Sequence, residues 1–188
     1  MVRTILKLAS VQRPKIPTLL SAFITLLNDR LGETIVFPLL PFLLERFATN
    51  GSTLGLLAGT YAISQFAFAP LIGALSDRFG RKPVITICVS GSVIGLCLFA
   101  ITVTLDWNNL LPVGASSIPL LLLFAARIID GASGGTAATA TAVLADISTP
   151  ENRAKTFGLI GVAFGLGFVL GPGLGTALAQ FSVTLPVW

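Results

Sequence analysis

The stretch that decides the fold is GALSDRFGRKP, residues 73–83, which lies between two long apolar runs. Four charged side chains fall within six positions, at Asp77, Arg78, Arg81 and Lys82. A helix needs about 20 apolar residues to cross the ~30 Å hydrocarbon core of a bilayer, and basic residues collect in the loops at its surface. The stretch is therefore predicted to be a short charged loop between two membrane-spanning helices.

The rest of the composition indicates the same environment. Of the 188 residues, 54% are hydrophobic and 11% are charged, against about a quarter charged in soluble domains. The mean hydropathy is +0.90. We predict an all-α, polytopic membrane protein with five complete transmembrane helices and the start of a sixth. After a tail over residues 1–16, the spans are expected at about 17–40, 53–75, 83–105, 119–142 and 157–178, with the sixth beginning at 183–188.

The chain ends within about one turn of the start of this sixth apolar run. Six complete spans would need roughly 20 more residues. We therefore expect the sequence to be a fragment or a truncated product.

Basic residues are distributed unevenly among the predicted loops. Nine Lys and Arg fall in the N-terminal tail and in the loops after the second and fourth spans, whereas the loops on the other side hold only Arg46. Cytoplasmic loops carry the excess of Lys and Arg in membrane proteins. We expect a multi-pass protein of the cell (inner) membrane with a cytoplasmic N-terminus. The asymmetry accounts for the sequence pI of about 9.6, so no nucleic-acid partner is expected.

The residue inventory excludes several kinds of active site. The chain contains no His, which rules out His-based zinc sites and Ser-His-Asp triads. Cys88 and Cys97 are nine positions apart in one predicted helix, so they face opposite sides and cannot form a disulfide. We expect neither a metal site nor a cofactor, and no enzymatic activity.

Ionisable groups nevertheless lie inside the first span. The stretch NDRLGETIVFPLLP, residues 28–41, contains Asp29, Arg30 and Glu33. Helical spacing places the three within an arc of about 100° on one face, and Asp29 lies ~18 Å from the start of the span, near the membrane centre.

Two other spans bring polar groups to the same depth. Arg127 and Asp130 are three residues apart in the fourth span, and Tyr61 and Gln65 are one turn apart in the second. A charge at mid-bilayer costs ~2.5–3.5 kcal/mol on insertion scales. Such charges either join helices as ion pairs or line a water-filled cavity, and the cost favours the cavity. The candidate proton and substrate pathway comprises Asp29, Arg30, Glu33, Tyr61, Gln65, Arg127 and Asp130. Asp29 is its leading candidate for the carboxylate that takes up a proton or binds a substrate cation.

The charged loop resembles the signature loop of the major facilitator superfamily, G-x-L-x-D-R-x-G-R-K. The matching positions are Gly73, Leu75, Asp77, Arg78, Gly80, Arg81 and Lys82. In that family the loop latches the two halves of a transporter and helps to govern its opening. From the residues alone, we expect Gly73 to permit close helix contact, Gly80 to allow a tight reversal and Asp77 to end the helix beside basic partners.

The fourth and fifth spans carry two further resemblances to this family. Arg127, followed by Gly131 and Gly135, resembles an R-x-x-x-G motif linked to proton coupling. The fifth span resembles the antiporter pattern G-x8-G-x3-G-P-x2-G-G, although Thr176 replaces its last Gly. The matching positions are Gly158, Gly167, Gly171, Pro172 and Gly175.

Spacing alone makes a prediction for the same span. Gly167, Gly171 and Gly175 recur every four residues, which predicts a groove where another helix backbone can approach closely. Pro172 is expected to add a bend.

Within the superfamily, the first two spans resemble those of tetracycline-type drug/proton antiporters. The matching positions are Asp29, Gly32, Pro38, Pro41, Tyr61, Gln65 and Pro70, and the resemblance covers about residues 20–178. It implies the N-terminal half of a major facilitator fold, built from inverted three-helix repeats, and export of a small molecule in exchange for protons by alternating access. Arg30 and Glu33 depart from the pattern, so tetracycline itself is not implied.

The expected partners are the lipid bilayer, protons and an unidentified small-molecule substrate. Two alternatives to the first part of an antiporter stay open at this stage. The chain could be a half-transporter that pairs with a C-terminal half on a second polypeptide or with itself, or a membrane scaffold or decayed gene product that transports nothing.

The loop charges make a prediction about topology. Cysteines introduced near Phe79 and Asn152 should react with an impermeant thiol reagent only from the cytoplasm, and cysteines near Asn50 and Asn108 only from outside, because basic loops stay inside. The opposite labelling would overturn the predicted orientation.

Overall fold

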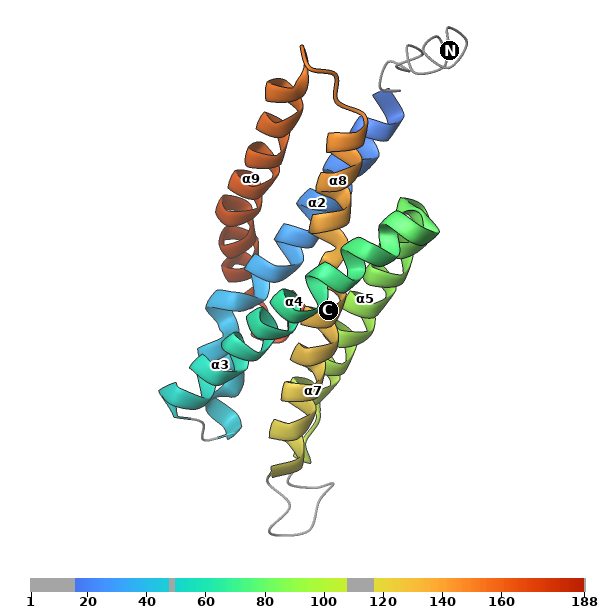
Figure 1. Ribbon diagram of the computed structural model, residues 1–188. Coiled ribbons are helices and arrows are strands. Elements are labelled where there is room, and N and C mark those ends of the chain that lie inside the picture. Colours follow the sequence, from blue (N-terminus) through green and yellow to red (C-terminus); the bar gives the residue numbers. More distant parts are fainter. Residues whose placement is uncertain (1–15, 48–49, 108–116, 188) are drawn as a thin grey trace, which may run out of the picture.

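The computed structural model, which describes residues 16–47, 50–107 and 117–187, is a bundle of long helices without a strand in those ranges (Figure 1). The long helices are α2 (Ile16–Val36), α4 (Gly51–Phe79), α5 (Arg81–Thr104), α7 (Ser117–Ser133), α8 (Gly135–Asp146) and α9 (Arg153–Ala179). Short elements complete the chain: the 3-10 helix η1 (Phe37–Leu39), α3 (Leu40–Leu44), and the 3-10 helices η2 (Glu45–Phe47) and η3 (Leu185–Val187). The predicted all-α class is confirmed.

Among the described residues, four helical stretches are long and apolar enough to cross a membrane. They are Gly51–Phe79, Arg81–Thr104, Ser117–Asp146 and Arg153–Ala179. The third combines α7 and α8, which are separated only by Gly134. Helix α2 has 21 residues, but Asp29, Arg30 and Glu33 give it more charge per residue than the other four stretches have. With α2 the fold has five long helical stretches; where the bilayer begins and ends on each of them is still a prediction.

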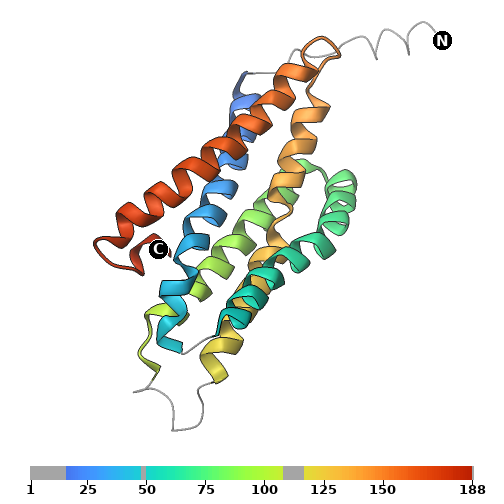
Figure 2. The same cartoon turned by 90° about the vertical axis from the view of Figure 1, so that its left-hand side faces the viewer.

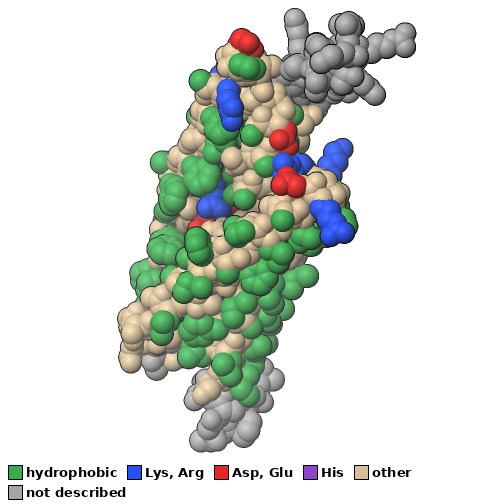
Figure 3. Space-filling model, viewed as in Figure 1, with side chains coloured by type: hydrophobic (Ala, Val, Ile, Leu, Met, Phe, Trp, Pro, Cys, Tyr) green, Lys and Arg blue, Asp and Glu red, His purple; other side chains and the backbone are tan. Residues whose placement is uncertain are grey.

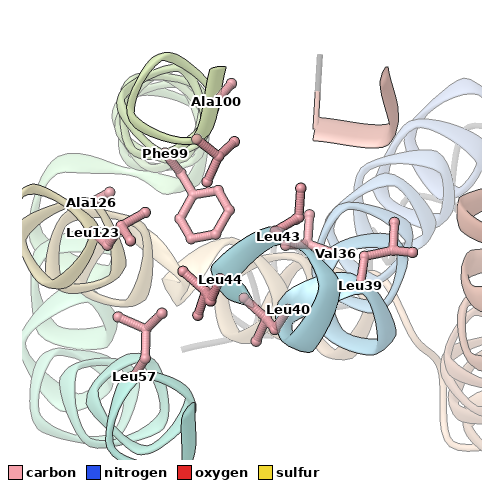
Figure 4. Close-up of a cluster of buried hydrophobic side chains, with 11 residues drawn as sticks. Val36, Leu39, Leu40, Leu43, Leu44, Leu57, Phe99, Ala100, Leu123 and Ala126 are labelled. Carbon is pink, nitrogen blue, oxygen red and sulfur yellow. The ribbon is translucent and has the colours of Figure 1, made fainter. Parts of the chain in front are cut away.

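The first long helix is interrupted before the end of the predicted span 17–40. Proline lacks a backbone N–H and clashes with the preceding turn of a helix, and here Pro38 and Pro41 replace regular helix after Val36 with η1 and α3. These short segments pack into the main buried apolar cluster, where the Phe99 ring of α5 points toward Leu43 and Leu44 (Figure 4). The prolines thus end α2 at Val36, and the segment that follows packs into the buried apolar cluster.

The helices pack as two groups that share the fourth span. Helix α2 packs along α9 and α8, while α4 and α5 both pack against α7 (Figures 1 and 2). The outside of the bundle carries large apolar side chains, with Phe66 84% and Ile87 70% exposed (Figure 3). That surface suits contact with lipid, and the α7–α8 segment at the centre contacts both groups.

The predicted groove on α9 is filled by α2. A Cβ atom added at Gly167 would lie 2.7 Å from Cβ of Arg30, and one at Gly175 would lie 2.8 Å from the carbonyl oxygen of Ile35. The Thr34 hydroxyl also donates a hydrogen bond of 2.8 Å to the carbonyl of Gly167. Gly158, the first glycine of the same pattern, has nothing within 4 Å of an added Cβ. The glycines nearer the C-terminal end of α9 therefore set how closely α2 approaches.

The charged loop is shorter than the reversal of two to three residues that was expected there. Gly80 alone connects α4 to α5. Its backbone φ is 93°, a value that residues other than glycine rarely adopt. The expectation that Gly73 permits close helix contact is wrong, because nothing lies within 4 Å of a Cβ added there. Gly73 lies on a face of α4 that no other described helix contacts at this position. Its match to the signature motif therefore did not predict a packing contact.

The α2–α9 contact predicts a difference between two glycines of one helix. Gly171→Ala should destabilise the bundle by about 1–3 kcal/mol, because the new methyl group would collide with Thr34. Gly161→Ala is the matched control, since an added Cβ meets nothing within 4 Å there. Unfolding in a denaturing-detergent titration measures both, and equal stability of the two variants would contradict the described packing.

Candidate functional site

Arg30 joins two carboxylates of its own helix. Its Nη2 lies 2.6 Å and its Nε 3.1 Å from Oδ2 of Asp29, and its Nη1 pairs with Glu33. The guanidinium also lies over the ring of Phe164 in α9, 5.0 Å from its centroid. Arg30 is buried, with 7% of its surface exposed, so its charge is neutralised locally and its fork of donors is occupied.

The second ion pair, in α7, is looser. Nη1 of Arg127 lies 3.5 Å from Oδ2 of Asp130. The Arg127 guanidinium lies 4.4 Å from the centroid of Phe99. Its Nε and Nη2 atoms are buried without a hydrogen-bond partner. A buried guanidinium with unused donors is costly, and Arg127 therefore has capacity to bind a further acceptor.

The polar residues of α4 reach the break in the fourth span. The Gln65 amide donates hydrogen bonds of 3.3 Å to the Tyr61 hydroxyl and of 3.3 Å to the carbonyl of Gly134. Gly134 separates α7 from α8. Gly134 is the N-cap of α8, so the bond from Gln65 joins α4 to the start of that helix.

A cavity of about 490 Å³ brings these elements together. Its volume falls within the range of ~300–1,000 Å³ typical of ligand pockets. Its ionisable lining residues are Asp29, Glu33, Tyr61 and Asp130, and neither Lys nor Arg belongs to the lining. A neighbouring cavity of about 100 Å³ is lined by Glu33, Tyr61 and Arg127.

The structure thus gathers most of the predicted pathway and separates the rest. Asp29, Glu33, Tyr61 and Asp130 face the larger cavity, and Arg127 faces the smaller one. Arg30 and Gln65 line neither of the two. Arg30 forms ion pairs with Asp29 and Glu33 outside the cavity lining. Gln65 donates a hydrogen bond to the backbone of the fourth span.

Several uncharged polar residues of this site escaped the sequence analysis. Asn28, Ser92 and Thr136 line the larger cavity, and the Thr136 hydroxyl is buried without a partner. Ser and Thr in membrane helices often bond to their own backbone, as Thr25 does to the carbonyl of Ser21. Their presence in an apolar run therefore carries little signal.

The charges of the site do not balance. Three carboxylates, from Asp29, Glu33 and Asp130, share two guanidinium groups, from Arg30 and Arg127. With every group ionised, one negative charge is left in excess inside an apolar bundle. Such a charge is expensive in apolar surroundings, and one proton or one cationic group would balance it.

The signature loop forms a separate polar centre around Arg81. This side chain pairs with Asp77 of α4 at 2.8 Å and with Asp146, the last residue of α8, at 3.1 Å. It also donates a hydrogen bond to the Ser76 hydroxyl at 2.5 Å. Asp77 thus has the expected basic partner, but it lies in the last turn of α4 and does not end the helix, which continues to Phe79. Asp146 was missed, because nothing in the sequence places the end of the fourth span beside this loop.

Comparison with known proteins places the chain in a family. The profile of the Major Facilitator Superfamily matches residues 20–188. The class C tetracycline resistance protein of Escherichia coli is 39% identical over 165 residues, which cover 86% of this chain and 38% of that protein. The quinolone resistance protein NorA of Staphylococcus aureus is 35% identical over 159 residues, or 84% of this chain and 37% of that protein.

A solved structure agrees with these relatives. The crystal structure of the human organic anion transporter MFSD10 superposes with a TM-score of 0.71 at 31% identity, over 94% of this chain and 45% of that one. The chain spans about two fifths of the length of the curated relatives that it matches. The chain belongs to the Major Facilitator Superfamily, and it corresponds to the N-terminal half of that fold.

Proposed function

We propose that the chain forms the N-terminal part of a secondary active transporter that exports a small molecule in exchange for protons by alternating access. The observation that carries this proposal is the cavity of about 490 Å³ lined by three carboxylates with one negative charge in excess. A proton and a substrate group can compete for that charge. Binding of one then releases the other, which is the requirement for exchange.

The arrangement around Arg30 suits a site that is protonated and deprotonated repeatedly. One guanidinium contacts both Asp29 and Glu33. When a proton binds one carboxylate, the other keeps its pair with Arg30. The charge of the cavity changes while no buried cation loses its last partner, which would cost ~3–5 kcal/mol.

The lining also favours a class of substrate. Its carboxylates lie beside apolar side chains such as Leu31, Val93 and Leu96, a combination that suits a molecule with an apolar body and a positively charged group. The tetracycline and quinolone resistance proteins support a drug-like substrate. The anionic substrates named for the human structural relative do not fit a lining without Lys or Arg.

The Arg81 centre is proposed to act as a latch on the cytoplasmic side, in a multi-pass protein of the inner membrane with a cytoplasmic N-terminus. It joins the end of α4, the start of α5 and the end of α8 through Asp77 and Asp146. The bond between Arg81 and Asp146 has to break whenever the end of α8 separates from the α4–α5 turn. The latch would thereby set how readily this side opens.

The length of the match bears on the alternative in which the chain is a half-transporter. The chain spans about two fifths of its curated relatives, so residues beyond this bundle, on the same or a second polypeptide, would close the cavity. Proton-driven uptake by vesicles containing the chain alone, against vesicles that also contain a second half, separates the two cases. If neither kind of vesicle transports, the chain would be a membrane scaffold and not a transporter.

Asp29 provides the first test of coupling. In a version completed by a second half, Asp29→Asn should insert normally, because Arg30 keeps its pair with Glu33, and proton-coupled export should be lost. The control is the double variant Asp29→Asn with Arg30→Gln. Export against a gradient is measured in inverted vesicles, and a normal rate in the double variant would mean that the pair only holds the helix together.

Asp77 provides the second test. The Asp77 side chain is 67% exposed, and Arg81 keeps its second partner Asp146. Ion pairs at the surface contribute only ~0.2–1 kcal/mol, so Asp77→Asn should leave insertion and abundance nearly unchanged. Transport by the completed version should be abolished. Glu151→Gln, at an exposed carboxylate of the loop before α9, is the matched control. Normal transport by Asp77→Asn would reduce the loop to a membrane anchor.

A further inference from the structure

An apolar groove opens on the outside of the bundle where α4 turns into α5. It has a volume of about 460 Å³, and its floor is the buried cluster of Ile72, Val84 and Cys88. Its walls include the exposed side chains of Phe79 and Ile87, which are 62% and 70% exposed. From Ile72 to Phe79 the groove follows α4 for ~10 Å, and it ends at the polar tip of the hairpin.

Two exposed basic residues are sequence neighbours of residues that line this groove. The Arg78 guanidinium lies 5.4 Å from the centroid of Phe79, a wall residue, and Lys82 directly precedes Pro83, another lining residue. Arg81 is occupied by Asp77 and Asp146. Arg78 and Lys82 form no ion pair with any carboxylate in the described part of the chain. Figure 3 shows Lys and Arg side chains projecting from this tip next to hydrophobic surface.

We propose that the groove, with its floor of Ile72, Val84 and Cys88, binds one anionic phospholipid, whose acyl chain occupies the groove and whose headgroup phosphate binds Arg78 and Lys82. The apolar floor excludes a polar ligand. The two uncompensated charges at its mouth select a negative headgroup over a zwitterionic one. The lipid would lie against the start of α5, one residue from Arg81, and would therefore contact the latch directly.

The segment between α8 and α9, which is predicted to lie on the same side of the membrane, supplies a matched control. Arg153 lies over the ring of Phe157 at 5.5 Å, which repeats the relation of Arg78 to Phe79, and Lys155 is exposed nearby. Neither residue lies on the groove. Removal of these two charges lowers the net charge of the chain by the same amount as removal of Arg78 and Lys82.

The test is native mass spectrometry of the full chain in mild detergent, with equimolar long-chain phosphatidylglycerol and phosphatidylcholine. One phosphatidylglycerol per chain should be retained in preference to phosphatidylcholine. The double variant Arg78→Gln with Lys82→Gln should bind it about thirtyfold more weakly, as expected for two basic residues. The double variant Arg153→Gln with Lys155→Gln should bind it as the wild type does.

The acyl chain is tested separately. Cys88→Phe fills the floor without changing a charge and should abolish retention. A short-chain phosphatidylglycerol should be retained poorly by the unmodified chain, which tests the same point without a mutation. The proposal is overturned by equal retention of the two long-chain lipids, by equal loss in both double variants, or by equal retention of short-chain and long-chain phosphatidylglycerol.

Discussion

The ion pairs of Arg30 are the interaction on which the rest of this structure depends. A guanidinium buried to 7% exposure between Asp29 and Glu33 allows two carboxylates to face a cavity inside an apolar bundle. Without a shared cation, two negative charges four positions apart on one helix would repel each other and resist insertion. Arg30 is placed in turn by α9, whose Gly167 leaves room for its Cβ and whose Phe164 covers its guanidinium. The packing of α2 against α9 therefore also determines where the charges of the site lie.

The fourth span connects this site to the other helices. Its first part, α7, carries Arg127 and Asp130, and its interruption at Gly134 receives a hydrogen bond from Gln65. Its second part, α8, ends at Asp146, the partner of Arg81 in the signature loop. One segment thus contacts both the larger cavity and the Arg81 centre. A change in the tilt of this segment would move residues of the cavity and of the Arg81 centre together.

Long apolar runs and helical spacing predicted the helices and the two groups of buried charges, because both depend on residues close together in the chain. The signature loop was predicted for the same reason. The larger cavity, the interhelical bond from Thr34 to Gly167 and the pair of Arg81 with Asp146 join residues from different helices, and no local pattern encodes them. The early end of α2 at Val36 was missed although Pro38 and Pro41 were visible, because hydropathy alone extended the span. Gly73 shows the converse, since a matching motif position does not make a packing contact.

The connection through Gly80 also restricts how α4 and α5 can move. A single residue between two helices leaves no slack, so neither helix can slide along the other and neither can rotate about its own axis independently. What Gly80 permits is a scissoring of the two helices about that point. The far ends would travel most and the tip least, so a small change of angle at the tip becomes a large displacement at the far ends of the two helices. A residue inserted at Gly80 would loosen this connection, and the angle between α4 and α5 would no longer be set by one residue.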